Sequence, residues 1–456
     1  MLIGAPPVPV PTTIAVPCGG KRPYCAQLRY PEEEITSFRE VAIEEFTTDF
    51  GGLRRAVPRA VYRMPSAFPS ALLGSGRPLT LRGAGHSCHG QTVTDGELLV
   101  TYAPGAAASQ VRLLGDGLVE VPAGMSWYGL ERYLNRRGLA LPVLTDYLHV
   151  SVGGTLSVGG VGTYSVRYGM QVDQVERIQL IDGTGASRWC SRNDHPELFR
   201  FALGGLGTVG LIERAVLRTV PYQRETHVHR VRHATLAELA EYAERIAQRE
   251  DVVAYWAGLR RDKLYSFIGL DGSDRRRCSE ENCTFRLDLP FIGQRESGRP
   301  AGLRVDRVRL WSDYVVPAGR LAPMVAAVEP LLQRAPLNRV RPILYFLIMR
   351  RPPDATSFAF APTSAAPVSI GLGIYTGVEP HDQAAVAGIR DAFRDLLARC
   401  CELGGRPYLY GSVDLDSSLA ERLYGTDLER LAQLRSSYRL EHVNAHLPLA
   451  RAAVPT

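Results

Sequence analysis

The chain has 456 residues, with 53 Lys or Arg, 47 Asp or Glu, and a formal net charge of +6 at pH 7. This length exceeds what one simple core holds, so we expect two domains or one large domain with an insertion. The basic residues are spread along the chain, and the dense run Arg275–Arg277 lies in a polar segment typical of a solvated loop. Nucleic-acid binding is therefore not expected.

The N-terminal segment Met1–Val16 is apolar and rich in proline but has no basic start. Because no later stretch is long and apolar enough to span a bilayer, we expect neither a signal peptide nor a membrane segment. The 8 cysteines lack the paired spacing of a zinc site and do not suggest the disulfide framework of a small secreted fold. We predict a cytoplasmic protein without a metal site.

The first part of the chain alternates predicted strands and helices. Ser126 is a typical N-cap for a helix over Trp127–Arg137, and Gly138 ends that helix. Strands are predicted over Arg77–Arg82, Gly96–Tyr102 and Leu118–Pro122. A hairpin over Val175–Ile181 and Ala186–Ser191, a helix over Glu197–Leu203 and a strand over Leu211–Val220 follow.

Pro221 marks a predicted boundary, after which Thr235–Arg249 has the apolar periodicity of an amphipathic helix. Later strands are predicted over Val252–Leu259, Lys263–Leu270, the region near Leu303–Leu310, Ile343–Met349 and Val368–Tyr375. Helices are predicted over Leu321–Leu332 and Asp382–Leu403. This order of elements favours an α+β architecture with two layered domains.

A first glycine-rich segment, Leu81–Gln91, reads Leu-Arg-Gly-Ala-Gly-His-Ser-Cys-His-Gly-Gln. Gly83 and Gly85 permit a tight turn whose backbone N–H groups can surround a phosphate. His86 follows directly, and an imidazole there can act as ligand, base or nucleophile. A plain turn at the end of a strand is the alternative.

A second glycine-rich segment runs from Thr145 to Gly162 and contains several Ser and Thr residues. Its glycine density predicts an irregular loop rather than a regular element. Backbone and hydroxyl groups of such a loop can wrap a large polar cofactor, whereas a bulged loop without a ligand is the alternative.

The two segments together resemble a known family. They resemble FAD-linked oxidases of the vanillyl-alcohol oxidase and p-cresol methylhydroxylase type in three motifs, Gly85–Ser87, Thr145–Leu148 and Gly204–Gly210. Within that group, the residues of these motifs are most similar to those of cytokinin dehydrogenases. The resemblance is strong over residues 45–222 and returns at Tyr424–Leu431. It implies an FAD-binding domain in two parts, residues 1–222 and 415–456. Between them, residues 223–414 would form a substrate-cap domain with an antiparallel sheet flanked by helices.

The resemblance also implies which residues hold the cofactor, with His86 joined covalently to the flavin. Leu211 matches a backbone contact on the adenine side. The complete set of implied cofactor-binding residues is Arg82, Gly83, Ala84, Gly85, His86, Ser87, Gln91, Thr145, Asp146, Ser151, Gly154, Ser157, Val161, Leu211, Tyr410 and Asn444.

Asp146 matches the carboxylate that the family places over the flavin to take a proton from the substrate amine, although a turn aspartate is the alternative. Tyr255 is the second candidate base. One departure concerns the cap, because Ala254 stands where cytokinin dehydrogenases carry a glutamate. Adenine recognition as in that family is therefore in doubt, and the altered cap is compatible with a role in secondary metabolism.

The sequence thus predicts an FAD-dependent oxidoreductase that oxidises a C–N bond of a small molecule by hydride transfer to the flavin. Oxygen or another acceptor would take the electrons onward. An alcohol oxidase of the same superfamily is one alternative, and a flavin-binding protein without turnover is another. The oligomeric state is left open.

Overall fold

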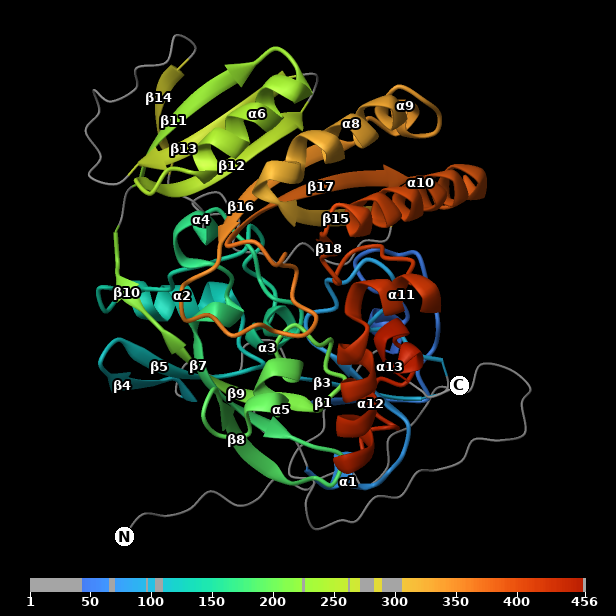
Figure 1. Cartoon of the computed structure of the whole chain (residues 1–456). Helices are drawn as coiled ribbons and strands as arrows, with labels where there is room; N and C mark the ends of the chain where they lie inside the picture. Colours follow the sequence, from blue (N-terminus) through green and yellow to red (C-terminus); the bar gives the residue numbers. More distant parts are fainter. Residues whose placement is uncertain are drawn as a thin grey trace.

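The computed structural model describes residues 43–64, 70–95, 97–102, 110–223, 226–260, 263–270, 283–288 and 306–453. Met1–Val16, Gly96, Arg275–Arg277 and Leu303 lie outside these residues. The elements form two parts, one above the other in Figure 1. No helix in the described ranges combines the length and apolar character needed to cross a membrane.

The lower part contains two main sheets. The first is parallel, with β3 (Leu98–Tyr102) between β1 (Ala60–Met64) and β2 (Leu79–Arg82). The second is antiparallel, in the order β4 (Arg112–Gly115), β5 (Leu118–Pro122), β9 (Leu211–Arg218), β7 (Val175–Ile181) and β8 (Ser187–Ser191). The short strands β6 (Leu139–Ala140) and β10 (Val220–Pro221) pair with each other.

The helices of the lower part surround these sheets. They are α1 (Ser70–Gly74), α2 (Trp127–Asn135), α3 (Val152–Leu156), α5 (Pro196–Ala202), α11 (Ser417–Tyr424), α12 (Thr426–Ser437) and α13 (Pro448–Ala452). The short helix α4 (Ser165–Tyr168) belongs to the same stretch of chain but packs against the upper part. The C-terminal segment returns to the parallel sheet, because the Leu79 N–H donates to the His442 carbonyl at 3.0 Å and the Asn444 N–H donates to the Leu79 carbonyl at 2.9 Å.

The upper part is one antiparallel sheet with helices packed on it (Figure 1). Its strand order is β14 (Cys283–Asp288), β11 (Thr226–His233), β13 (Lys263–Leu270), β12 (Val252–Arg260), β16 (Ile343–Arg350), β17 (Val368–Val378), β15 (Val308–Pro317) and β18 (Arg406–Pro407). The helices are α6 (Leu236–Ala247), α8 (Leu321–Leu332), α9 (Leu337–Val340) and α10 (Gln383–Glu402).

Most residues of β15 and β17 are buried, and the two-residue period of each strand divides the side chains between the two faces of the sheet. In β15, Tyr314 points to the helices, since its hydroxyl donates to the Phe393 carbonyl of α10 at 3.0 Å. Its neighbour Asp313 faces the lower part, together with Trp311 and Val315. The sheet thus forms a wall above the lower part.

The predicted α+β class and most predicted elements are confirmed, including α2 with its Ser126 cap and α6 with its Thr235 cap. Two predictions need correction. The strand expected near Leu303–Leu310 is β15, which begins at Val308 and ends at Pro317. The second glycine-rich segment is not wholly irregular, because α3 forms inside it.

The cause of the second correction is a local cap. Ser151 Oγ accepts a hydrogen bond from the Gly154 N–H at 3.3 Å, which satisfies one free donor of the first turn. Val152 and Leu156 are fully buried. Capping and burial together outweigh the cost of two glycines in so short a helix.

Candidate active site

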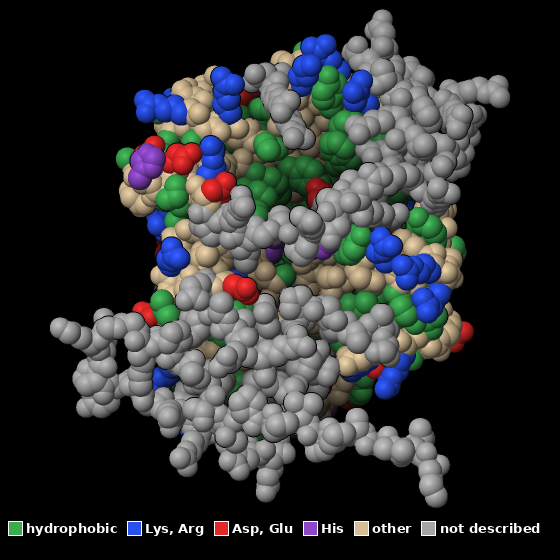
Figure 2. All heavy atoms as spheres, turned by 180° about the vertical axis from the view of Figure 1, so that it is seen from behind, with side chains coloured by type: hydrophobic (Ala, Val, Ile, Leu, Met, Phe, Trp, Pro, Cys, Tyr) green, Lys and Arg blue, Asp and Glu red, His purple; other side chains and the backbone are tan. Residues whose placement is uncertain are grey.

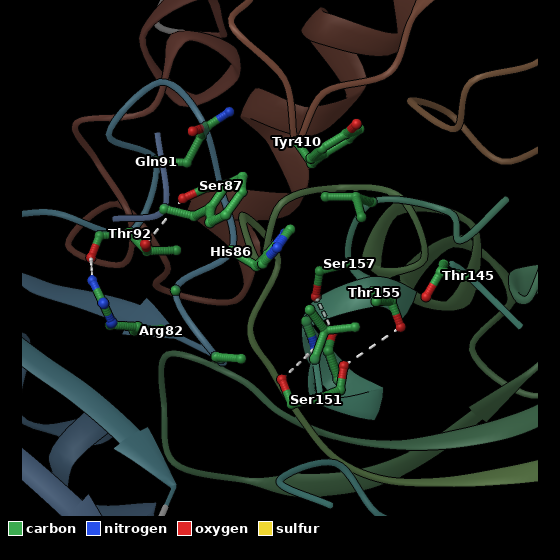
Figure 3. Close-up of a pocket in the computed structure, with 18 of the residues that line it drawn as sticks. Arg82, His86, Ser87, Gln91, Thr92, Thr145, Ser151, Thr155, Ser157 and Tyr410 are labelled. Carbon is green, nitrogen blue, oxygen red and sulfur yellow. Dashed lines mark hydrogen bonds between the residues drawn. The ribbon is translucent and has the colours of Figure 1, made fainter. Parts of the chain in front are cut away.

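A cavity of 1130 Å³ lies between the two parts of the molecule. Its lower wall comes from the two glycine-rich segments, and its upper wall comes from β15, β16 and β17. Figure 2 shows hydrophobic side chains gathered around a hollow in the upper half of the face opposite to that of Figure 1. Figure 3 shows residues of the lower wall, with His86, Ser157 and Tyr410 arranged around a common space.

The first glycine-rich segment contacts the second directly. Gly85 has a φ of 71°, a conformation that favours glycine. At Gly83, an added Cβ would lie 2.5 Å from Ser151 Oγ and 3.3 Å from the Gly154 Cα. Only a residue without a side chain lets these two backbones approach so closely.

Asp49 holds the loop that carries His86. Its carboxylate accepts hydrogen bonds from Ser87 Oγ at 2.8 Å, from the Gly90 N–H at 2.7 Å and from the Gly52 N–H at 3.2 Å. Burial raises the pKa of Asp49, and these hydrogen bonds oppose the shift. Three donors pointing at one buried group suit an ionised carboxylate. The sequence analysis did not identify Asp49 as a residue of the site.

His86 lies between two aromatic rings. Its ring centroid is 4.0 Å from that of Phe50 and 4.7 Å from that of Tyr147, and both pairs are stacked. Burial lowers the pKa of His86 to about 4. The imidazole is therefore neutral at neutral pH, and a neutral imidazole nitrogen has the lone pair that a nucleophile needs.

Hydrogen bonds from neighbouring segments hold the second glycine-rich segment in place. Trp127 Nε1 donates to Thr155 Oγ1 at 2.5 Å. Ser157 Oγ donates to the Gly153 carbonyl at 2.7 Å, and Figure 3 shows Ser157 and Thr155 side by side at the cavity. The Leu206 N–H donates to the Ser157 carbonyl at 2.7 Å. The third glycine motif, Gly204–Gly210, is therefore packed against α3, next to the cavity.

Asp146 faces the cavity from the lower part. Its side chain is exposed to this space. Desolvation by the surrounding protein raises its pKa. The Tyr345 hydroxyl of β16 opposes that shift. A carboxylate in such a position has the basicity that general-base catalysis requires.

The upper wall adds a second carboxylate that the sequence analysis missed. Asp313 of β15 is only 8% exposed, and its Oδ1 accepts a hydrogen bond from the Tyr375 hydroxyl at 3.0 Å. Tyr410 in turn donates to the Tyr375 hydroxyl at 3.3 Å. Burial raises the pKa of Asp313 to about 6, and the two tyrosines oppose the shift. A charged residue within an apolar strand was the only signal for it in the sequence.

All predicted cofactor residues line the cavity except Asn444. The Asn444 side chain is buried behind the wall, where it accepts from the Leu81 N–H at 2.8 Å and donates to the Leu206 carbonyl at 3.0 Å. It therefore ties the first glycine segment to the third. Arg82 borders the cavity, but its guanidinium donates to the backbone carbonyls of Thr48 and Thr92.

Tyr255 is not placed to act as a base in this cavity, which corrects the second candidate. It is fully buried in β12, and its hydroxyl lies 3.2 Å from Ser266 Oγ, which is 2.9 Å from His233 Nε2. His233 packs against Tyr242 of α6, so Tyr255 lies on the helix side of the sheet. Ala254 is also buried and does not line the cavity.

Sequence comparison with known proteins matches the region that carries the two glycine-rich segments. Residues 71–191 match the "FAD binding domain" family. The glycine contacts, the hydroxyl-lined segment and the size of the cavity fit a dinucleotide cofactor. The chain therefore resembles FAD-binding oxidoreductases over part of its length.

Within that class, the chain is similar to cytokinin dehydrogenases. It is 34% identical to cytokinin dehydrogenase 4 of Oryza sativa subsp. japonica over 223 residues, which are 46% of this chain and 42% of the relative. It is 40% identical to cytokinin dehydrogenase 4 of Arabidopsis thaliana over 138 residues, 29% of this chain and 26% of the relative. An uncharacterized oxidoreductase in the fasciation locus of Rhodococcoides fascians is 35% identical over 158 residues, 35% of each chain. The chain thus spans less than half the length of these relatives.

Proposed function

We propose that this protein oxidises a C–N bond of a small-molecule amine and that residues 223–414 form the cap over its substrate. FAD supplies an acceptor for the hydride that leaves the carbon, and oxygen or another acceptor then takes the electrons. The loss of hydride from carbon and of a proton from nitrogen leaves a C=N bond. The observation that carries the proposal is the carboxylate of Asp146 at the same cavity as the loop of His86.

Asp146 takes the proton from the substrate nitrogen in this proposal. Because the proton moves as the hydride leaves, a full positive charge does not develop on the substrate alone. The raised pKa of Asp146 brings its basicity closer to that of the group it deprotonates. Tyr345, whose hydroxyl favours the ionised form of Asp146, keeps the carboxylate available as a base.

His86 holds the cofactor covalently in this proposal. Its low pKa keeps the ring nitrogen unprotonated, and Phe50 and Tyr147 fix the orientation of the ring. Gly83, Gly85 and the segment of α3 border the cavity, where their backbone would hold the pyrophosphate. Asp49 and Asn444 support these loops from behind.

The first experiment tests the cofactor and the reaction class. Absorption spectra are recorded before and after acid denaturation, and yellow colour in the pellet would establish a covalent flavin. Anaerobic bleaching is then followed with a panel of amines and alcohols. We expect bleaching by amines. Bleaching by alcohols alone would establish an alcohol oxidase instead, and bound flavin that no panel member reduces would favour a binding protein.

We expect the substrate to differ from the cytokinins that the names of the relatives indicate. Ala254 replaces the family glutamate, and the upper wall near the cavity carries Asp313 instead. We therefore expect slow bleaching by isopentenyladenine compared with other amines. Rapid bleaching, at rates typical of efficient enzymes, would contradict this expectation.

A further inference from the structure

One carboxylate oxygen of Asp313 has no hydrogen-bond partner among the described residues. Its Oδ1 accepts from Tyr375, but its Oδ2 is buried and has no hydrogen-bond partner in the part of the chain that the structure describes. The residue lines the cavity. A buried polar atom without a partner needs a physical explanation, and a bound ligand, ion or water is one.

No cationic side chain among the described residues forms an ion pair with Asp313. The groups that stabilise its charge are the hydroxyls of Tyr375 and Tyr410. Two neutral donors compensate only part of the cost of burying a carboxylate, because a buried charge is normally paired with an opposite charge. The positive partner can therefore come from whatever occupies the cavity.

The surroundings of Asp313 suit a cation in a second way. Trp311 and Tyr375 are stacked with centroids 4.5 Å apart, and both line the cavity. The faces of such rings attract positive charge, and carboxylates with aromatic walls are a common arrangement for binding ammonium groups. A neutral apolar group can pack against these rings but would leave the carboxylate without a partner.

Asp313 and Asp146 belong to one row of side chains across the cavity. Tyr345 lies next to Asp146, and its ring centroid is 6.1 Å from that of Tyr375, which donates to Asp313. One ligand lying along the two tyrosines would meet one carboxylate at each end. The reacting nitrogen would be at Asp146, and a different group would be at Asp313.

We propose that Asp313 binds a second, positively charged nitrogen of the substrate, so that the substrate class is an amine with two basic nitrogens. This inference rests on the proposed function, because it assigns the reacting nitrogen to Asp146. The second nitrogen donates a charge-assisted hydrogen bond to the Asp313 carboxylate and lies beside the stacked rings of Trp311 and Tyr375. Asp313 then selects the substrate and takes no part in proton transfer.

The test measures binding, without turnover. Isothermal titration calorimetry is run anaerobically on the protein with its flavin reduced, so that no hydride can be accepted, and compares a homologous series of linear diamines with the matching monoamines. We expect the best diamine to bind about tenfold to a hundredfold more tightly than its monoamine, as for one charge-assisted hydrogen bond. Asp313→Asn should remove this preference, whereas Asp391→Asn, the same change at an exposed site on α10, should keep it.

The outcomes separate this inference from the proposed reaction. Diamine preference that Asp313→Asn does not reduce would overturn the inference, as would a wild-type protein that binds every diamine no better than its monoamine. The wild-type comparison decides the matter even if Asp313→Asn does not fold. Preference with no flavin reduction by any amine would support Asp313 as a cation site and reject amine oxidation.

Discussion

His86 lies face to face with Phe50, with 4.0 Å between ring centroids and 16° between ring planes. Phe50 follows Asp49, whose carboxylate holds the loop after His86 through Ser87 and Gly90. One short segment therefore both orients the imidazole and fixes the turn that presents it. This relationship links the shape of the loop to the chemistry of its histidine.

The first prediction concerns the covalent bond. We expect His86→Ala to bind FAD noncovalently, because the glycine segments and α3 remain in place. Mass spectrometry of the unfolded wild-type chain should find an added flavin mass on the peptide that contains His86. An unmodified peptide from fully yellow protein would rule out the bond.

The second prediction concerns the support of the loop. Asp49→Ala leaves three donors without their acceptor, so we expect a loss of about 2 kcal/mol or more in unfolding free energy and less covalent flavin. Asp49→Asn retains one acceptor oxygen and should lose less. Denaturant unfolding and the fraction of flavinylated chain measure both effects. Equal covalent flavin in all three proteins would show that the loop does not depend on Asp49.

The two walls of the site differ in how far the sequence predicts them. The lower wall is local: Gly83, Gly85 and His86 are adjacent, and the need for a tight turn is visible in their spacing. The upper wall depends on pairing between distant strands, since Tyr375 reaches Asp313 across 62 positions. Gly373 makes room for this carboxylate, because a Cβ there would lie 2.5 Å from Asp313 Oδ1. No local pattern reveals such a match.

The error at Tyr255 has a related cause. Consecutive residues of a strand point to opposite faces, so one step along β12 decides whether a side chain meets α6 or the lower part. In most strands, apolar residues alternate with polar ones, so the sequence shows which face of the strand is buried. Here both faces are covered, one by helices and the other by the lower part, and that difference in polarity is small. Asn444 was predicted from the resemblance to contact the cofactor, whereas its hydrogen bonds hold loops together.

The third prediction is a pH dependence of stability. Asp414 accepts from Arg390 at 2.6 and 2.9 Å and lies 3.3 Å from His89 Nε2, so it joins α10 to the loop of His86. Burial alone would raise its pKa, but the hydrogen bonds from His89 and Arg390 hold it well below the ordinary value of 3.8. In acid the unfolded chain therefore takes up a proton that the folded carboxylate does not. The stability from Asp414 is present above pH 4 and is lost as the pH falls below it.

We expect Asp414→Asn to lower the unfolding free energy by roughly 1–3 kcal/mol at neutral pH, with a smaller difference from wild type below pH 4 or so. Urea unfolding at several pH values measures this. Asp391→Asn removes an exposed ion pair with Arg394 and should change stability by less than about 1 kcal/mol. A difference between wild type and Asp414→Asn that grows in acid would contradict the assignment.

The fourth prediction concerns the base. Asp146→Asn keeps the shape of the side chain but cannot accept the substrate proton. Loss of a general base typically lowers the rate about a hundredfold to ten-thousandfold. We therefore expect the single-turnover rate of flavin reduction to fall by this amount, with unchanged FAD content, since Asp146 makes no contact that holds the loop of His86 in the described structure. Wild-type and variant protein are compared under anaerobic conditions with the amine that bleaches the wild type fastest.

Asp313→Asn is the matched control, because it makes the same change on the opposite wall of the cavity. If Asp313 only binds the second nitrogen, its variant should need a higher amine concentration to reach half-maximal rate but should keep the maximal reduction rate within about tenfold. Asp146→Asn should do the reverse. Equal maximal rates for Asp146→Asn and wild type would show that Asp146 is structural, and a large loss of maximal rate in Asp313→Asn would make Asp313 the proton acceptor instead.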